Sequence, residues 1–170
     1  MSEESGSLDK ARNTPEIEDE IVKRLDGDLR ERALGFVVWL NENNMAPKQW
    51  FSPAIWKTPT PGGKYYSFGI FMNRPGEFRL YFYRGDYKGE FDEGFLKTVH
   101  DHVRPCVDCG GDCPKGRDMT IFGKEFSNTC FQFPIQFENP NTATLEYIKE
   151  LIEYWKVIAP YNTDKLHVLG

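Results

Sequence analysis

The residues with the clearest chemical potential are the four cysteines. Three of them, Cys106, Cys109 and Cys113, lie within "CVDCGGDC", and the fourth is Cys130. Two thiolates with C-x2-C spacing can bind one metal ion from a single tight loop, at Zn–S distances of about 2.3 Å. The sequence therefore predicts a structural zinc site closed by these four thiolates, with no open position for catalysis.

The same thiols leave other interpretations open. Cys106 and Cys109 could instead form the dithiol of a thiol–disulfide oxidoreductase, in which one thiolate is the nucleophile. Asp108 and Asp112 argue against this alternative, because nearby negative charge disfavours a thiolate. An iron–sulfur cluster also uses four cysteines, but the C-x2-C-x2-C-x3-C spacing of ferredoxins is not reproduced. The remaining interpretation is that the thiols are packed without a ligand.

A second candidate site lies on a predicted hairpin formed by residues 64–72 and 77–83. One register places four residues of the first strand on the same, buried face as Phe78, Leu80 and Phe82; these four are Tyr66, Phe68, Ile70 and Met72. The opposite face then carries the candidate ligand-binding residues Tyr65, Phe71, Arg79, Tyr81 and Tyr83, with Ser67 and Gly69 between them. We expect a small molecule or a protein as the ligand. The alternative is that a helix covers this face or that its tyrosines meet water.

No catalytic residue is assigned. The chain has no nucleophile elbow, phosphate loop or HExxH helix, so we expect a non-enzymatic protein. An enzyme that holds an anion with Arg79, Lys57 or Lys64 is a weaker hypothesis, because no general base accompanies these cations.

Length and charge exclude several classes of protein. The chain has 170 residues, which suits one domain, and its net charge is −5 without a run of basic and aromatic residues, so nucleic acid is not expected as a partner. The first residues lack a signal-peptide pattern and no stretch is apolar enough to span a membrane, so we expect a cytoplasmic protein. Its thiols would then stay reduced, which favours metal binding over disulfides.

The periodicity of apolar residues predicts the elements that position these sites. A two-helix opening follows Pro15, with a break at "DGD", an N-cap at Asp28 and an end at "NENN". Residues 47–61 contain four prolines and are expected to be irregular, before a turn at "PGGK".

The second half of the chain continues this mixture of helices and strands. Asp92 is expected to cap a helix that Pro105 ends, and residues 117–137 look extended, with Pro134 marking an edge strand. A last helix runs from "NPNT" to Pro160. We therefore predict an α+β fold: an antiparallel sheet of two hairpin-like pieces flanked by helices, with a leader at 1–14, one domain at 15–160 and a tail at 161–170.

The cysteine loop also carries a family resemblance. Together with "WKTPTPGGKYY" and "FENPNTATLEYIKELIEYW", the stretch "CVDCGGDCPKGRDMTIFGKEFSNTC" resembles a family of small uncharacterised cytoplasmic proteins of Gram-positive bacteria. The resemblance covers roughly residues 30–158 and implies an intracellular α+β domain without an assigned catalytic residue. It carries over the family's cysteine positions and the adjacent "GKEF" at 123–126. This chain departs from the family in a longer, proline-containing spacer before its glycine–lysine pair.

Overall fold

The computed structural model describes residues 16–61, 66–110 and 112–157. The predicted leader, the predicted C-terminal tail, most of the "PGGK" turn and the candidate ligand-binding residue Tyr65 lie outside the described residues. None of the helices within the described ranges is long and apolar enough to cross a membrane.

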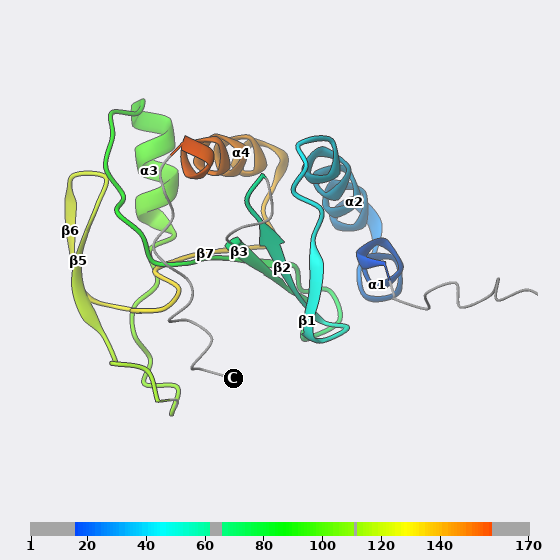
Figure 1. Cartoon of the computed structure of the whole chain (residues 1–170), viewed down its shortest axis with the longest axis horizontal. Coiled ribbons are helices and arrows are strands. Elements are labelled where there is room, and N and C mark those ends of the chain that lie inside the picture. Colours follow the sequence, from blue (N-terminus) through cyan, green and yellow to red (C-terminus); the bar gives the residue numbers. More distant parts are fainter. Residues whose placement is uncertain (1–15, 62–65, 111, 158–170) are drawn as a thin grey trace, which may run out of the picture.

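Helices and an antiparallel sheet form the two main layers of the domain (Figure 1). In chain order the elements are α1 (Ile17–Arg24), α2 (Gly27–Glu42), β1 (Lys48–Ser52), β2 (Ile55–Pro59), β3 (Tyr66–Phe71), β4 (Arg79–Phe82), α3 (Glu93–Asp101), β5 (Arg117–Ile121), β6 (Lys124–Thr129), β7 (Ile135–Glu138) and α4 (Thr142–Val157). Five strands form one sheet in the order β1-β2-β3-β4-β7, while β5 and β6 form a separate hairpin. The predicted single α+β domain is confirmed.

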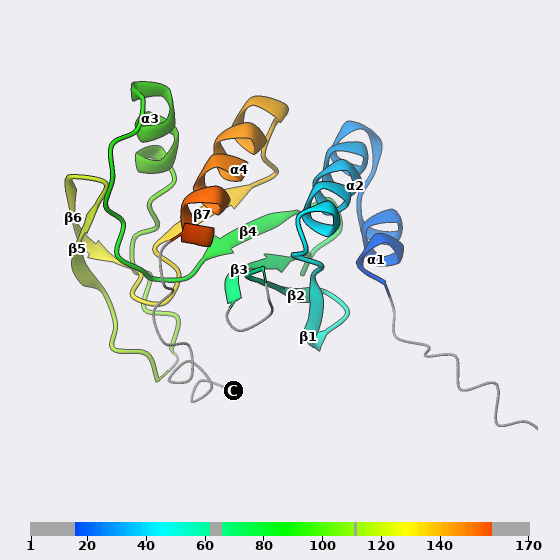
Figure 2. The same ribbon diagram turned by 45° about the horizontal axis from the view of Figure 1, so that its top comes forward.

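The helices gather on one side of the five-stranded sheet (Figures 1 and 2). Helices α2 and α4 cover this face, and α3 stands beside α4, next to the β5–β6 hairpin. No helix of the described chain lies against the opposite side of the sheet, which we call the helix-free face. The two faces therefore offer different environments to alternate residues of every strand.

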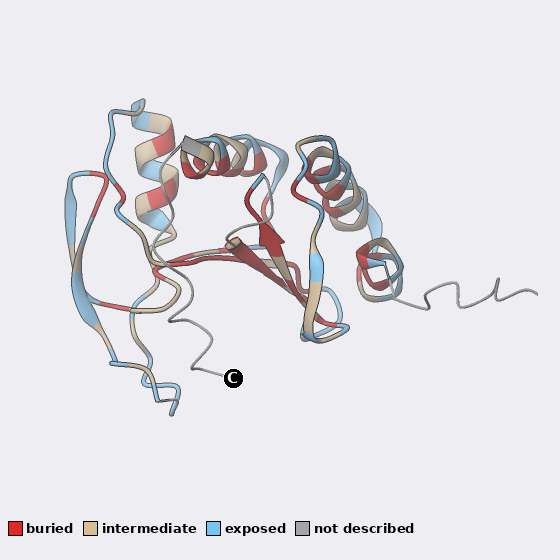
Figure 3. Ribbon diagram, in the orientation of Figure 1, coloured by how far each residue is buried: buried red, intermediate tan, exposed pale blue. Residues whose placement is uncertain are grey.

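The core lies between the helices and the sheet, where Figure 3 shows the buried residues. One row of paired residues runs across four strands on this side: Trp56, Ile70, Leu80 and Phe137, each at most 3% exposed. The helices contribute buried residues to the same core, and these include Phe36, Val37, Leu40, Ile148, Leu151 and Trp155. Burial of each large apolar side chain contributes about 1.5–3 kcal/mol, so this row fixes which strand face turns inward.

The two-helix opening is confirmed, but its break differs in detail. The N-cap of α2 is Asp26, not Asp28, which lies in the first turn of the helix. Gly27, the first residue after this N-cap, takes a positive φ of 54°, which glycine adopts without strain. Asn44, directly after the C-cap Asn43, has a φ of 58°, as expected for an asparagine that ends a helix.

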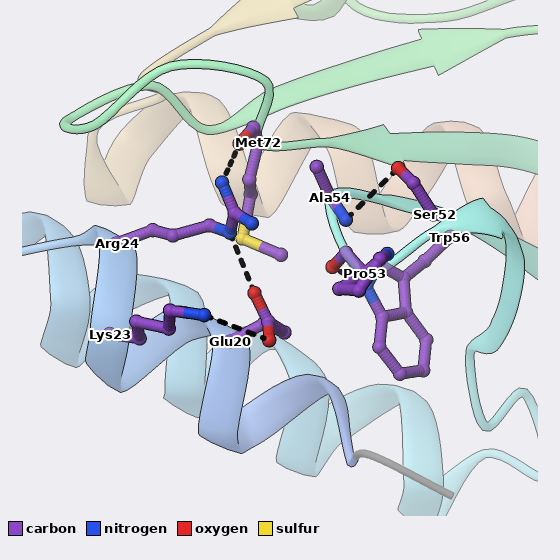
Figure 4. A network of polar contacts seen from close by, with 8 residues as sticks. All are labelled: Glu20, Lys23, Arg24, Ser52, Pro53, Ala54, Trp56 and Met72. Atoms are coloured by element: carbon purple, nitrogen blue, oxygen red, sulfur yellow. Dashed lines mark hydrogen bonds and ion pairs between the residues drawn. The ribbon is translucent and has the colours of Figure 1, made fainter.

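Helix α1 is anchored to the sheet through Arg24 (Figure 4). The Arg24 Nε donates to Glu20 Oε2 at 2.7 Å, and its Nη1 donates to the carbonyl of Met72 at 3.2 Å. The Glu20 side chain is only 9% exposed, so this ion pair is less screened by water than a surface pair. The hydrogen bond from Arg24 to Met72 ties the first helix to the end of β3.

The expectation that residues 47–61 are irregular is wrong, because this segment forms the β1–β2 hairpin. Its prolines bound the strands instead of breaking them: Pro47 precedes β1, Pro53 lies in the turn and Pro59 is the last residue of β2. The Trp56 indole donates to the carbonyl of Pro53 at 2.9 Å, which stabilises the turn (Figure 4).

The predicted cap and edge strand in the second half are confirmed. Asp92 Oδ1 accepts a hydrogen bond from the Phe95 N–H at 2.8 Å, and β7, which follows Pro134, is an edge of the five-stranded sheet. Helix α3 ends at Asp101, before the expected end at Pro105. The chain then runs along the outer edge of β7, where the Arg104 N–H donates to the carbonyl of Pro134 at 2.7 Å.

Candidate functional sites

The helix-free face is built from two rows of paired residues. The first row crosses the sheet through Lys57, Gly69, Tyr81 and Gln136, and the second through Ile55, Phe71, Arg79 and Glu138. The predicted register of the β3–β4 hairpin is therefore correct for Phe71, Arg79 and Tyr81, which share this face. Because strand residues alternate, the same register turns Phe68, Ile70, Leu80 and Phe82 into the core.

Tyr66 is the exception to the predicted alternation. It was expected on the core face, but the ammonium of Lys57 lies 4.1 Å from the centre of its ring. Lys57 belongs to the helix-free face, so Tyr66 lies on that side too. The register between β2 and β3 shifts between Thr58 and Pro59, and this irregularity explains why strict alternation fails at the start of β3.

Aromatic rings cluster at the centre of the helix-free face. Tyr81 contacts Phe71 and Phe133 edge to face, at centroid distances of 4.6 and 5.4 Å, and Tyr83 lies 5.3 Å from Phe133. A Cβ added to Gly69 would lie 2.6 Å from the Phe71 ring, so this ring occupies the space above the glycine. Phe133, from the segment before β7, was not recognised in the sequence as part of this face.

The Arg79 guanidinium is neutralised within the protein. It forms an ion pair with Glu77, and its Nε lies 3.5 Å from Glu138 Oε2. Its Nη1 also donates to the Tyr81 hydroxyl at 3.2 Å. An anionic ligand would have to compete with two carboxylates for this cation, which weakens its role as the anchor that the sequence suggested.

Two other cations on this face lack such carboxylates among the described residues. Lys57 lies between the rings of Trp50 and Tyr66, 5.5 and 4.1 Å from their centres. The Arg104 guanidinium lies 5.4 Å from the centre of the Tyr81 ring and 3.6 Å from Cys130 Sγ. Arg104 reaches this face because the chain pairs with β7 after α3, a long-range contact with no signal in the local sequence.

Two buried tyrosines stay protonated near neutral pH. Burial raises the pKa of Tyr83 above its ordinary value, and the neighbouring Tyr66 adds to the effect. Burial also raises the pKa of Tyr87, whose hydroxyl donates a hydrogen bond to the carbonyl of Tyr83. Tyr83 is therefore a neutral part of the helix-free face.

The cysteines lie at the base of the β5–β6 hairpin. Pro105 forms an antiparallel bridge with Thr129, the Cys106 N–H donates to Asn128 O at 2.7 Å, and the Cys130 N–H donates to Arg104 O at 2.8 Å. Cys106 and Cys130 are therefore diagonal neighbours on one side of this ladder, a relation that places such residues about 7–8 Å apart. Strand pairing thus brings together two cysteines that lie far apart in the sequence.

The other two cysteines lie in a loop whose ends meet. A Cβ added to Gly116 would lie 2.9 Å from the Cβ of Cys106, which shows that residues 106 and 116 are adjacent. Cys109 and Cys113 are each three residues from an end of this loop, and three residues span at most about 11 Å. Cys109 is exposed, while the other three cysteines are half-buried.

The predicted zinc site is not assembled in this arrangement. The described ranges include all four cysteines, and within them no group of three or more His, Cys, Asp or Glu residues is placed to hold a metal ion. Their thiols are also free, so Cys106 and Cys109 do not form a disulfide. Strand pairing sets Cys106 and Cys130 on one side of the ladder, and the loop cysteines do not complete a metal-binding group with them.

Comparisons with protein-family models, with curated proteins and with solved structures found no match. The resemblance to the Gram-positive family therefore stays an expectation.

Proposed function

We propose that this chain is a non-enzymatic binding domain that uses the helix-free face to hold a small ligand carrying aromatic rings. The observation that carries the proposal is the asymmetry of the sheet: helices cover one face, while the other carries rings together with cations that no described carboxylate neutralises. Lys57 and Arg104 are two of these cations, and Phe71, Tyr81 and Phe133 form the ring cluster.

Physical chemistry favours a ligand of this kind. Aromatic rings offer large, rigid contact areas at a low cost in conformational entropy, and a ligand ring can stack on them. Arginine and lysine beside the rings add charge complementarity, which selects among ligands of similar shape. In this proposal Phe71, Tyr81 and Tyr83 are part of the binding surface. Arg104, and not Arg79, is the arginine that contacts the ligand.

The test is a screen of small ring-bearing molecules by two-dimensional NMR of the amide groups. Binding compounds should shift the amides of β2, β3 and β4 and leave those of α2 largely unchanged. Arg104→Gln should weaken binding without lowering the melting temperature. The control is Arg117→Gln, an exposed change on the separate hairpin, which should leave binding unchanged. Compounds that shift only the amides of the helices would contradict the proposal.

A second proposal concerns the cysteine loop, which we propose closes around a structural zinc ion. The supporting observation is the ladder that sets Cys106 and Cys130 on one side, because two thiolates at this separation can share an ion through Zn–S bonds of about 2.3 Å. Cys109 and Cys113 would complete the shell by movement of a short loop that is already closed at its base.

Metal analysis of the purified chain tests this second proposal. One zinc per chain, lost in Cys109→Ser and in Cys130→Ser, is the expected result, and a chelator should lower the melting temperature of the wild type. A metal-free wild type with the same stability in chelator would refute it. Rapid alkylation of Cys106 and Cys109 in zinc-free protein, together with dithiol turnover, would support the oxidoreductase alternative instead.

A further inference from the structure

At one corner of the helix-free face, two positively charged side chains lie opposite each other. In the β1–β2 hairpin Lys48 pairs directly with Lys57, and like charges at such positions destabilise a strand pair. No carboxylate of the described chain forms an ion pair with either lysine. The protein has 26 acidic and 21 basic side chains, so this arrangement does not follow from a shortage of carboxylates.

Aromatic rings lie around Lys57 at this corner. Trp50 and Phe51 are stacked, with centroids 4.3 Å apart, although they are neighbours in the chain. The register shift between Gln49 and Ser52 accounts for this, because it breaks the alternation of side chains in β1. Phe51 is 60% exposed, an unusual state for a large ring, and Lys57 lies between the rings of Trp50 and Tyr66.

The corner is not suited to the addition of another strand. Strand β1 is an edge of the sheet, but it carries an irregular register and an exposed lysine, two features that protect edges against pairing. What the corner offers to a partner is instead its side chains on the helix-free face, which are two lysines and three aromatic rings. They fit a ligand that lies on the face of the sheet.

We propose that this lysine–aromatic corner, formed by Lys48, Trp50, Phe51, Lys57 and Tyr66, binds a planar aromatic anion. The two ammonium groups hold its phosphate or carboxylate, and the exposed rings contact its π face. This inference rests on the proposed function of the helix-free face and adds the charge of the ligand and the place where that charge is held. The rings already stabilise Lys57, but Lys48 has no such contact among the described residues.

The test compares 1-naphthyl phosphate with 1-naphthol by isothermal titration calorimetry. The two probes share one ring system and differ in charge, and 1-naphthoate shows whether a carboxylate replaces the phosphate. At low salt the phosphate should bind about tenfold more tightly than the naphthol, and the preference should shrink as salt rises. Lys48→Gln and Lys57→Gln should each remove most of this preference.

Lys88→Gln is the matched control, because Lys88 is an exposed lysine whose backbone N–H pairs with Tyr154 of α4. It should keep the full preference. Because Lys48 is exposed and Lys57 half-exposed, both test variants should fold, and each also removes the repulsion between the paired lysines.

Equal affinities for 1-naphthyl phosphate and 1-naphthol would overturn the anion site while leaving the binding function of the face intact. A preference that survives both lysine changes would overturn it as well. If neither probe binds and the NMR screen yields no compound on β2 to β4, the proposed function itself fails.

Discussion

Replacement of Gly85 by alanine tests how tightly α4 packs against the sheet side of the domain. Gly85 follows β4, and a Cβ at this position would lie 2.3 Å from Cη2 and 2.8 Å from Cζ2 of Trp155. Ordinary carbon–carbon contacts are about 3.5–4.0 Å, so the overlap exceeds an ångström. Because Gly85 is not in the left-handed region, the expected effect of Gly85→Ala is steric and not conformational.

The indole has little room to move away. Trp155 is 2% exposed, and its ring lies edge to face against Tyr87 at a centroid distance of 5.7 Å. Overpacking of this kind costs about 1–3 kcal/mol, whereas a glycine-to-alanine change without a clash gains about 0.4–1 kcal/mol through the unfolded state. We therefore expect Gly85→Ala to lower the free energy of unfolding by about 1–2 kcal/mol, with a melting temperature lower by about 2–8 °C.

Urea denaturation followed by circular dichroism measures the change. Gly35→Ala is the matched control, because Gly35 is an exposed residue of α2 with nothing within 4 Å of the added Cβ. A glycine in a helix interior is about 0.5–1 kcal/mol less favourable than alanine, so this control should stabilise the protein. The same substitution should thus have opposite signs at the two sites.

A double-mutant cycle with Trp155→Leu decides the mechanism. The smaller side chain removes the ring atoms that the new Cβ would meet, so Gly85→Ala should cost nothing further in that background. An equal cost of Gly85→Ala with and without the indole would refute the steric argument. So would a Gly85→Ala variant as stable as the wild type.

Three further predictions follow from local contacts. Asp92→Ala should lower the free energy of unfolding by about 1 kcal/mol in urea denaturation, because it removes the cap of α3, whereas Asp92→Asn should retain most of it. Between pH 8 and 11 stability should fall as pH rises through about 10, because burial raises the pKa of Tyr83 and Tyr87 and the unfolded tyrosines ionise first; a Tyr87→Phe variant should show a shallower fall in denaturation over this range. Gly116→Ala should disturb the base of the cysteine loop, since its Cβ would lie 1.9 Å from Asn128 Oδ1, and amide shifts of residues 106 and 128 in NMR spectra should report it, with Gly35→Ala as a change without a clash or a positive φ.

Much of the fold was predictable because it follows from local spacing. The apolar stripes identified α1, α2, α3 and α4, and the carboxylate of Asp92 marked a helix start. The alternation in β3 and β4 even gave the correct face for Phe71, Arg79 and Tyr81. The prolines misled in residues 47–61, where they bound a hairpin at its ends and turn, and at Pro105, since α3 ends earlier, at Asp101.

The sites depend on contacts that local spacing does not encode. Cys130 pairs across a ladder with Arg104, Arg104 reaches Tyr81 only because the chain follows β7, and a register shift moves Tyr66 to the helix-free face.

The sequence alone thus determined the chemical types available, four thiols and a hairpin rich in rings. Which of them meet was decided by the tertiary structure, because strand pairing joins residues far apart in the chain, and a shift of one residue in register sends a side chain to the other face of the sheet.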